Sequence, residues 1–468
     1  PIVGMFPYVI THLRHLHDWS TELLKKSNNT FLFIGLWISG FQLILTADLE
    51  NVNYILNTNF ANFPKGVEFR DMFDVFGDAL INADFELWKT NRKIAQMIIT
   101  HQLFKKFFVR STMEKVEKGL LPVFDHFADS GAVVDFQEIV QRLLFDSNCL
   151  TVTGFDPGSL AIDFPHNAFL KSLDIAEETI FYRHAIPKKV WKFLRWLNVG
   201  HERKFKQAWK TFDLIMPLVI AMKKREVAEA NRNGNAEVGG SLLESYLRDY
   251  KHEDQFLRDT MLGYMLAGRD TVSSVLIWFM WLITRHKEAE AKVLNEIDSL
   301  LSPDERGRRR LFTGDDVKEM TYLQCALSET LRLYPPVPFE LKVPLKPDTL
   351  PSGHRVNPKQ KIIIPLYSVA RLPSIWGDDC LEFKPERWFS ERGGLKHEPP
   401  HKFLAFHAGP RSCLGKEVSY TQLKIVAATL LHNYCFQVLE GQHPTPKAAI
   451  ILLMKNGLKV KVTHRRAS

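Results

Sequence analysis

The fold is indicated most strongly by ten consecutive residues, Phe406-His407-Ala408-Gly409-Pro410-Arg411-Ser412-Cys413-Leu414-Gly415. Apolar side chains recur at helical spacing after them, through Val426 and Leu430, so Cys413 is expected at or near the N-terminus of a helix. The helix dipole and the N–H groups of the first turn favour a thiolate over a thiol at such a position. A thiolate placed there can ligate a metal.

The neighbours of Cys413 suit a flat, anionic ligand. Gly409 and Gly415 carry no side chain where such a ligand would approach the backbone, and Arg411 can pair with a carboxylate on it. Heme iron held by a cysteinate meets these demands, and the thiolate pushes electron density towards O–O cleavage. The alternatives are a buried, inert cysteine or a nucleophilic thiol partnered by His407. Zinc is disfavoured, because the other cysteines are scattered and form no Cys-x-x-Cys pair.

A long helix is predicted from Asp254 to Arg285, with apolar residues nearly all round it, as in a helix buried at the centre of a protein. At about 1.5 Å per residue it would span on the order of 45 Å. Gly268 within it costs about 1 kcal/mol relative to Ala, so its presence asks for a reason. Close approach to a cofactor, or a local bulge in the helix, would supply one.

Asp270 and Thr271 follow in the same helix. The Thr271 hydroxyl can hold O2 or a water, while Asp270 lies about 100° further round the helix and is expected to turn outward. An outward acid and an inward alcohol make a proton relay, which the reduction of O2 to water requires. The structural alternative is a buried threonine bonded to the i−4 carbonyl and an aspartate paired with a lysine.

Two charged patterns complete the set. Glu329 and Arg332 share a helix face ahead of a Pro-Pro pair, and with Arg387 they could form a buried network that locks the loop carrying Cys413. Trp88 and Arg92 share a face at i, i+4, and both could donate to a carboxylate. Taken alone, each pattern is also typical of a solvated helix.

Together these elements resemble, in their order and separation, the cytochrome P450 monooxygenases, and the similarity runs from the Pro1–Gly4 start to the C-terminal end. The resemblance implies a mainly α fold with small β-sheets (α+β), the P450 fold, with a long central helix over heme. It implies a single heme-thiolate catalytic domain of residues 1–468. Cys413 would be the axial ligand of heme b. The other cofactor and structural positions would be Trp88, Arg92, Ala267, Gly268, Asp270, Thr271, Glu329, Arg332, Arg387, Phe406, Arg411 and Gly415.

The resemblance also implies partners and a location. NADPH–cytochrome P450 reductase would supply electrons, and O2 would react with a small apolar or aromatic substrate. Eukaryotic members carry an N-terminal membrane anchor, so we expect an anchor ahead of Pro1 and a domain on the cytosolic face of the endoplasmic reticulum. A net charge of +8 suits an anionic membrane or an acidic partner. No basic cluster interleaved with aromatic residues indicates a nucleic acid.

Finer resemblance points to a plant branch. Residues 267–271, 351–354, 409–411 and 413–416 look like those of plant fatty-acid ω-hydroxylases, and residues 73–78 and 393–399 look closer still to mid-chain alkane hydroxylases. That branch also holds alkaloid phenol-coupling enzymes of the noroxomaritidine synthase type. The chain departs from the hydroxylase pattern in three places. His407 replaces the usual Asn, Val272 replaces a second Thr, and Glu340 brings an acid into a segment that enters the substrate pocket in the family.

The substrate prediction depends on that acid. Glu340 could meet a protonated amine, with an ion pair to Lys342 as the alternative. The predicted pocket residues are Phe76, Val337, Phe339, Glu340 and Ile450. We therefore predict oxidative C–C phenol coupling of an aromatic amine alkaloid precursor, ahead of ω- or mid-chain hydroxylation of fatty acids or alkanes. A non-catalytic heme sensor is the distant alternative, since it would not need the Thr271 alcohol.

Small strands are expected near both ends of the chain. A hairpin is predicted between Thr30 and Asp48, a buried strand at Ile362–Ile364, and a closing β segment over residues 452–462.

Overall fold

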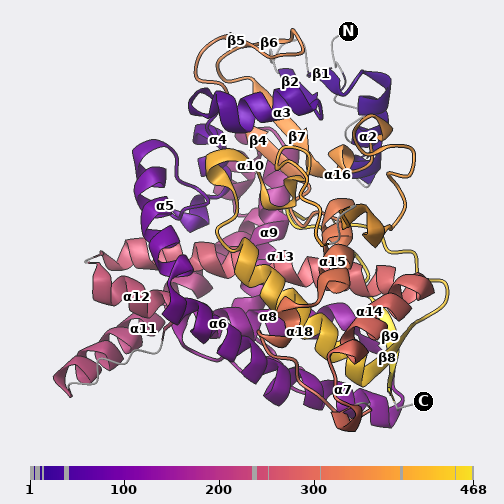
Figure 1. The fold of residues 1–468 in the computed structure, drawn as a ribbon. Helices are drawn as coiled ribbons and strands as arrows, with labels where there is room; N and C mark the ends of the chain where they lie inside the picture. Colours follow the sequence, from indigo (N-terminus) through magenta and orange to yellow (C-terminus); the bar gives the residue numbers. More distant parts are fainter. Residues whose placement is uncertain are drawn as a thin grey trace. The chain divides into compact units, whose positions relative to one another are not determined.

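The structure is a computed structural model that describes residues 5, 11–12, 15–35, 42–233, 240–250, 252–305, 307–390, 394–447 and 449–465. The Pro1–Gly4 start and residue 393 of the segment 393–399 lie outside these ranges. The chain forms two compact units, Pro1–Asp71 with Ser328–Cys413, and Met72–Leu327 with Leu414–Ser468. We call them the sheet unit and the helical unit. The predicted class, mainly α with small β-sheets, is confirmed (Figure 1).

The sheet unit is built on a four-stranded sheet in the order β1-β2-β7-β4. The hairpin predicted between Thr30 and Asp48 is confirmed as β1 (Thr30–Ile34) paired antiparallel with β2 (Gln42–Thr46). β7 (Lys361–Pro365) joins β2 in parallel and contains the predicted strand Ile362–Ile364, and β4 (Phe339–Lys342) pairs antiparallel with β7. Figure 1 shows strands far apart in the sequence, β1 and β2 in indigo and β4 and β7 in orange, side by side in this sheet.

The remaining elements of the sheet unit are short. They are α2 (Leu16–Lys26), α3 (Leu49–Asn53), η3 (Tyr54–Thr58), η4 (Phe60–Asn62), β5 (Asp348–Thr349), β6 (Arg355–Val356), α16 (Leu366–Val369), α17 (Pro373–Trp376), η9 (Pro385–Trp388), η10 (Leu404–Phe406) and η11 (Gly409–Arg411). α4 (Gly66–Met72) and α15 (Thr321–Leu333) each run from one unit into the other. The apolar core joins the buried face of the sheet to Leu404 and Ala408.

The helical unit holds the long helices. They are α5 (Phe85–Thr100), α6 (Gln102–Lys115), α7 (Leu121–Ser130), α8 (Phe136–Thr153), α9 (Ala168–Ala185), α10 (Lys188–Leu197), α11 (Gly200–Arg232), α12 (Leu242–Asp249), α13 (Asp254–Arg285), α14 (Lys287–Ser299) and α18 (Lys416–Asn433). Shorter elements are η5 (Asp74–Phe76), η6 (Val116–Leu120), η7 (Pro303–Glu305), η8 (Asp316–Lys318), β3 (Val134–Asp135), β8 (Tyr434–Val438) and β9 (Lys459–His464), the strands pairing in the order β3-β9-β8.

The central helix has the predicted bounds, Asp254–Arg285, and is buried on nearly every side. Among the described residues it is also the one helix long and apolar enough to cross a membrane, but 78% of its most apolar window is buried inside the protein, as in a core helix. The predicted closing strand is shorter than expected and begins at Lys459. The preceding Leu452 carbonyl accepts bonds from Ser274 Oγ (2.8 Å) and Trp278 Nε1 (2.7 Å), which tie that segment to α13 rather than to a strand.

Candidate active site

The cysteine loop, residues 404–413, presents Cys413 from a buried base. Leu404 and Ala408 lie in the apolar core, while Cys413 is exposed. The Cys413 N–H donates to the Phe406 carbonyl at 2.8 Å, which closes the loop. All five cysteines are described, and Cys413 alone is exposed. α18 begins at Lys416, so the predicted place of Cys413 just ahead of a helix is confirmed.

The structure gives a packing reason for a glycine at position 409 that the sequence did not predict. Its φ is +68°, a conformation that favours glycine, and a Cβ there would overlap the carbonyl of Leu56 on η3. The missing side chain therefore lets the cysteine loop pack against protein backbone. Arg411 in the same loop lies with its guanidinium carbon 5.9 Å from the centre of the Phe60 ring.

Trp88 and Arg92 both lie on α5, Trp88 buried and Arg92 half-buried. They belong to the helical unit and Arg411 to the sheet unit, so a common ligand for the three stays a prediction.

On α13 one face is open within an otherwise buried helix. Ala267 is exposed, and Gly268 and Thr271 are half-exposed. The Thr271 hydroxyl donates to the Ala267 carbonyl at 2.7 Å, the i−4 bond of the structural alternative. Because the hydroxyl hydrogen is used in this bond, the Thr271 oxygen can accept a further hydrogen bond from the open side.

Gly268 lies against another side chain of the protein, and this packing requires a glycine at that position of α13. A Cβ on Gly268 would overlap the amide of Asn148 on α8. That amide donates to the carbonyls of Met265 (2.9 Å) and Tyr264 (3.2 Å) on α13. The glycine therefore admits an asparagine between two helices.

Asp270 is not turned outward, and this prediction is wrong. It is fully buried, forms an ion pair with Arg269 and accepts a bond from Gln141 Nε2 at 3.2 Å. Arg269 also binds Asp174 at 2.6 Å and lies 3.8 Å from Glu177. Burial alone would raise the pKa of Asp270, but the Arg269 charge and the bonds from Glu177, Arg269 and Gln141 together lower it.

Glu177 on α9 is the member of this acidic cluster that sequence reasoning missed. Burial, followed by the charge of Asp270, raises its pKa well above the usual value. The pKa of Glu177 is therefore raised, while that of the neighbouring Asp270 is lowered. No motif or spacing in the sequence singles out Glu177.

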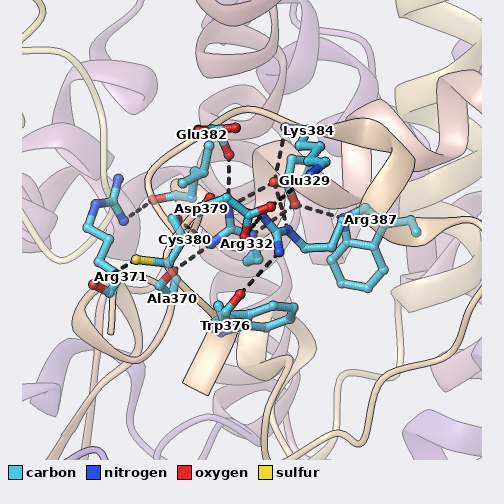
Figure 2. Close-up of polar contacts among 12 residues, drawn as sticks. Glu329, Arg332, Ala370, Arg371, Trp376, Asp379, Cys380, Glu382, Lys384 and Arg387 are labelled. Carbon is cyan, nitrogen blue, oxygen red and sulfur yellow. Dashed lines mark hydrogen bonds and ion pairs between the residues drawn. The ribbon is translucent and has the colours of Figure 1, made fainter. Parts of the chain in front are cut away.

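The structure brings Glu329, Arg332 and Arg387 together (Figure 2). Arg332 forms two bonds of 2.8 Å to the Glu329 carboxylate and also donates to the carbonyls of Ala370, Cys380 and Glu382. Arg387 Nε lies 3.3 Å from Glu329 Oε1.

Trp388, which the sequence did not single out, donates to Glu329 Oε2 at 2.9 Å. The network holds residues 370–388, part of the irregular segment that leads to Cys413.

The predicted pocket residues differ in their exposure. Phe76 is fully buried, so its exposure gives no support for a contact between its side chain and a substrate. Val337 is 40% exposed, and Phe339 and Ile450 are half-buried.

Glu340 is paired as in the alternative, not open to an amine. Its Oε1 lies 2.9 Å from Lys342 Nζ and 3.4 Å from His407 Nε2. Burial would raise the pKa of Glu340, but the charges of Lys342, His407 and Lys65 hold it well below its usual value.

The family is decided by comparison with known proteins. The profile of the family described as Cytochrome P450 matches residues 1–462. The chain belongs to the cytochrome P450 family.

Two of its P450 relatives are named for different chemistries. The chain is 41% identical to a protein named alkane hydroxylase MAH1 from Arabidopsis thaliana, over 99% of this chain and 93% of the relative. It is 40% identical to noroxomaritidine synthase 2 from Narcissus aff. pseudonarcissus MK-2014, over 99% and 90%. The crystal structure of the cytochrome P450DA heme domain shares the fold, with a TM-score of 0.78, 20% identity, and coverage of 96% of this chain and 93% of that one.

This P450 is therefore a heme-thiolate monooxygenase that works with a reductase, O2 and an organic substrate. The residues present fit heme. The structure offers one exposed thiol on a loop whose base is buried, and an open face of small side chains at Ala267 and Thr271. Among the described residues no group of three or more His, Cys, Asp or Glu could hold a metal ion without such a cofactor.

Proposed function

We propose that this P450 hydroxylates an alkyl C–H bond of a long apolar substrate, a fatty acid or an alkane. The observation that carries the proposal is the pairing of Glu340 with Lys342 and His407. A carboxylate already paired with the Lys342 ammonium and faced by the His407 ring offers little attraction to a protonated amine, because a second cation would be repelled by the first. The prediction of an aromatic amine substrate loses its main argument.

Cys413 is proposed as the axial thiolate, with Trp88, Arg92 and Arg411 binding the heme propionates and Phe406, Gly415, Ala267 and Gly268 lying against the cofactor. When bound, the heme iron activates O2 with electrons from the reductase. Glu329, Arg332 and Arg387 keep the segment before the cysteine loop in place. These assignments rest on the match of each residue to the family pattern and on the geometry above.

Proton supply is proposed to run through the acidic cluster. Glu177 holds a proton beside Asp270, and Thr271, whose oxygen is free to accept, orients a water on the open face of α13. Asp270 is anchored by Arg269 and so can pass a proton without leaving its place.

We further propose that residues 1–468 act as one catalytic domain served by NADPH–cytochrome P450 reductase at the endoplasmic reticulum membrane, facing the cytosol. Support for membrane contact comes from α10, which carries Lys188, Lys189 and Arg195 beside two exposed rings. Phe193 is 55% exposed and Trp196 is 77% exposed. Such a helix suits a lipid interface.

The double variant Phe193→Ser/Trp196→Ser should sediment less with anionic vesicles than the wild type. Leu381→Ser, at another exposed apolar residue, should sediment as the wild type does. Equal binding by the wild type and both variants would contradict the proposal.

The substrate class is tested by spectral titration of the ferric holoenzyme. Long-chain acids and alkanes should shift the spin state of the ferric heme and yield hydroxylated products with reductase and NADPH. Phenolic aromatic amines are the second candidate class, favoured by the 40% identity to a noroxomaritidine synthase. Tight binding of those amines, with coupled-ring products and no response to the long chains, would reverse the assignment.

A further inference from the structure

Two residues that depart from the family pattern contact each other. Glu340 on β4 and His407 in the cysteine loop lie 3.4 Å apart, Oε1 to Nε2. Both belong to the sheet unit, and their side chains are only 12% and 19% exposed. The contact joins a strand of the central sheet to the loop that presents Cys413.

His407 has an unusual backbone conformation. Its φ is +61° and its ψ is 178°, a region that is essentially restricted to glycine. A residue with a side chain stays there only when its surroundings impose the conformation. Such strain is concentrated at functional sites.

Several contacts impose the conformation of His407. Its N–H donates to the Leu404 carbonyl at 2.7 Å, and the buried Leu404 and Ala408 fix the chain on either side. One ring nitrogen, Nδ1, lies 2.7 Å from the Ala408 carbonyl, and the other, Nε2, faces Glu340 Oε1 at 3.4 Å. Glu340 is held in turn by Lys342 at 2.9 Å. Protein oxygens therefore lie beside both nitrogens of the ring.

The conformation of His407 determines where Phe406 and Cys413 lie. The carbonyl of Phe406, the residue before His407, accepts the Cys413 N–H at 2.8 Å. A rotation at His407 would move this carbonyl and release the cysteine backbone. We infer that Glu340 and His407 are positioning residues, whose contact holds the cysteine loop in the conformation that presents the Cys413 sulfur to heme iron. The inference rests on the proposed role of Cys413.

The test follows the reduced, carbon monoxide-bound holoenzyme, whose red-shifted band reports an intact thiolate ligand. Glu340→Gln should speed the loss of this band at a fixed elevated temperature by about tenfold, the equivalent of roughly 1.4 kcal/mol. Adding His407→Gly should return the rate towards that of the wild type, because glycine at position 407 adopts the required φ without a contact to residue 340. Heme content, measured after gel filtration, provides a readout independent of turnover.

The rescue separates positioning from other causes. If Glu340→Gln acted only by leaving Lys342 without its carboxylate, His407→Gly would restore nothing, and the inference would be overturned. It would also be overturned if Glu340→Gln lost the band at the wild-type rate. His443→Gly, the same substitution at an exposed histidine, should leave the rate unchanged. Absence of the band in the wild type would instead defeat the assignment of Cys413.

Discussion

At Glu177 the charges of the buried cluster do not balance. Three carboxyl groups, Asp174, Glu177 and Asp270, surround the single guanidinium of Arg269. Like charges in a low-dielectric interior raise the cost of ionising the last carboxyl, and Glu177 is the one farthest from the guanidinium, at 3.8 Å. The proton therefore belongs on Glu177.

This assignment predicts a pH dependence of stability. Because the folded pKa of Glu177 is raised above its ordinary value of 4.5, the folded state binds more protons than the unfolded state between that pH and the raised pKa. The contribution of Glu177 is fully present below about pH 4.5 and is lost as the pH rises through the raised folded pKa. Glu177→Gln, neutral at every pH, should flatten the fall in the free energy of unfolding, measured with urea between about pH 5 and 8.

Asp270 acts outside this pH range, since its lowered pKa acts below the ordinary value of 3.8. Burial also raises the pKa of Asp174, which adds its own fall in stability to the wild type and the variant alike, so the test is the difference between their slopes. The matched control is Glu178→Gln, at the neighbouring residue whose side chain is 37% exposed. It should leave the slope as in the wild type. A wild-type slope in Glu177→Gln would contradict the proton assignment.

Arg332 gives a second prediction at the residue scale. Lysine cannot replace its five hydrogen bonds, two to Glu329 and three to backbone carbonyls, because lysine has three donors and no planar fork. Arg332→Lys should cost about 3–5 kcal/mol of stability, as when a buried ion pair is broken. Chemical denaturation and heme content measure the loss. Arg355→Lys, at an exposed arginine of the same unit, should change neither, and an equal loss there would refute the specific role of Arg332.

At the scale of elements, the fit between α8 and α13 depends on Gly268 and Asn148. Gly268→Ala gains up to about 1 kcal/mol in helix propensity but forces a Cβ into the Asn148 amide, and overpacking costs about 1–3 kcal/mol. We expect a net loss of stability in thermal unfolding. In the background of Asn148→Ala the same change should be neutral or favourable. Additive losses would show that the two residues do not compete for this space.

Helices were easier to predict than the reasons for their glycines. α13 could be predicted to its exact ends from a long apolar run, since a helix buried all round needs little more. Gly268 and Gly409 were predicted to let a cofactor approach, and the structure adds a reason that was not predicted, because both make room for protein, Asn148 in one case and the Leu56 carbonyl in the other. A contact between segments far apart in sequence leaves no periodic signal.

For the whole molecule, the sequence was sufficient for the family, because four independent patterns had to agree. The sequence was insufficient to predict which charged side chains pair with one another. Asp270 was expected to face outward and Glu340 to await an amine, and both are paired inside the protein. The partners of Asp270 include Asp174 and Glu177, which lie nearly a hundred residues earlier, and no spacing rule links them. Substrate choice therefore depends on three-dimensional pairing that the chain alone does not reveal.

The central claim is that the Cys413 sulfur is the thiolate ligand of the heme, and the carbon monoxide difference spectrum of the reduced protein tests it most directly. The wild type and Cys435→Ala, which alters a half-buried cysteine on β8, should both show the red-shifted band. Cys413→Ala should lose it. A red-shifted band that survives in Cys413→Ala, or its absence from freshly purified wild-type holoenzyme, would contradict the account.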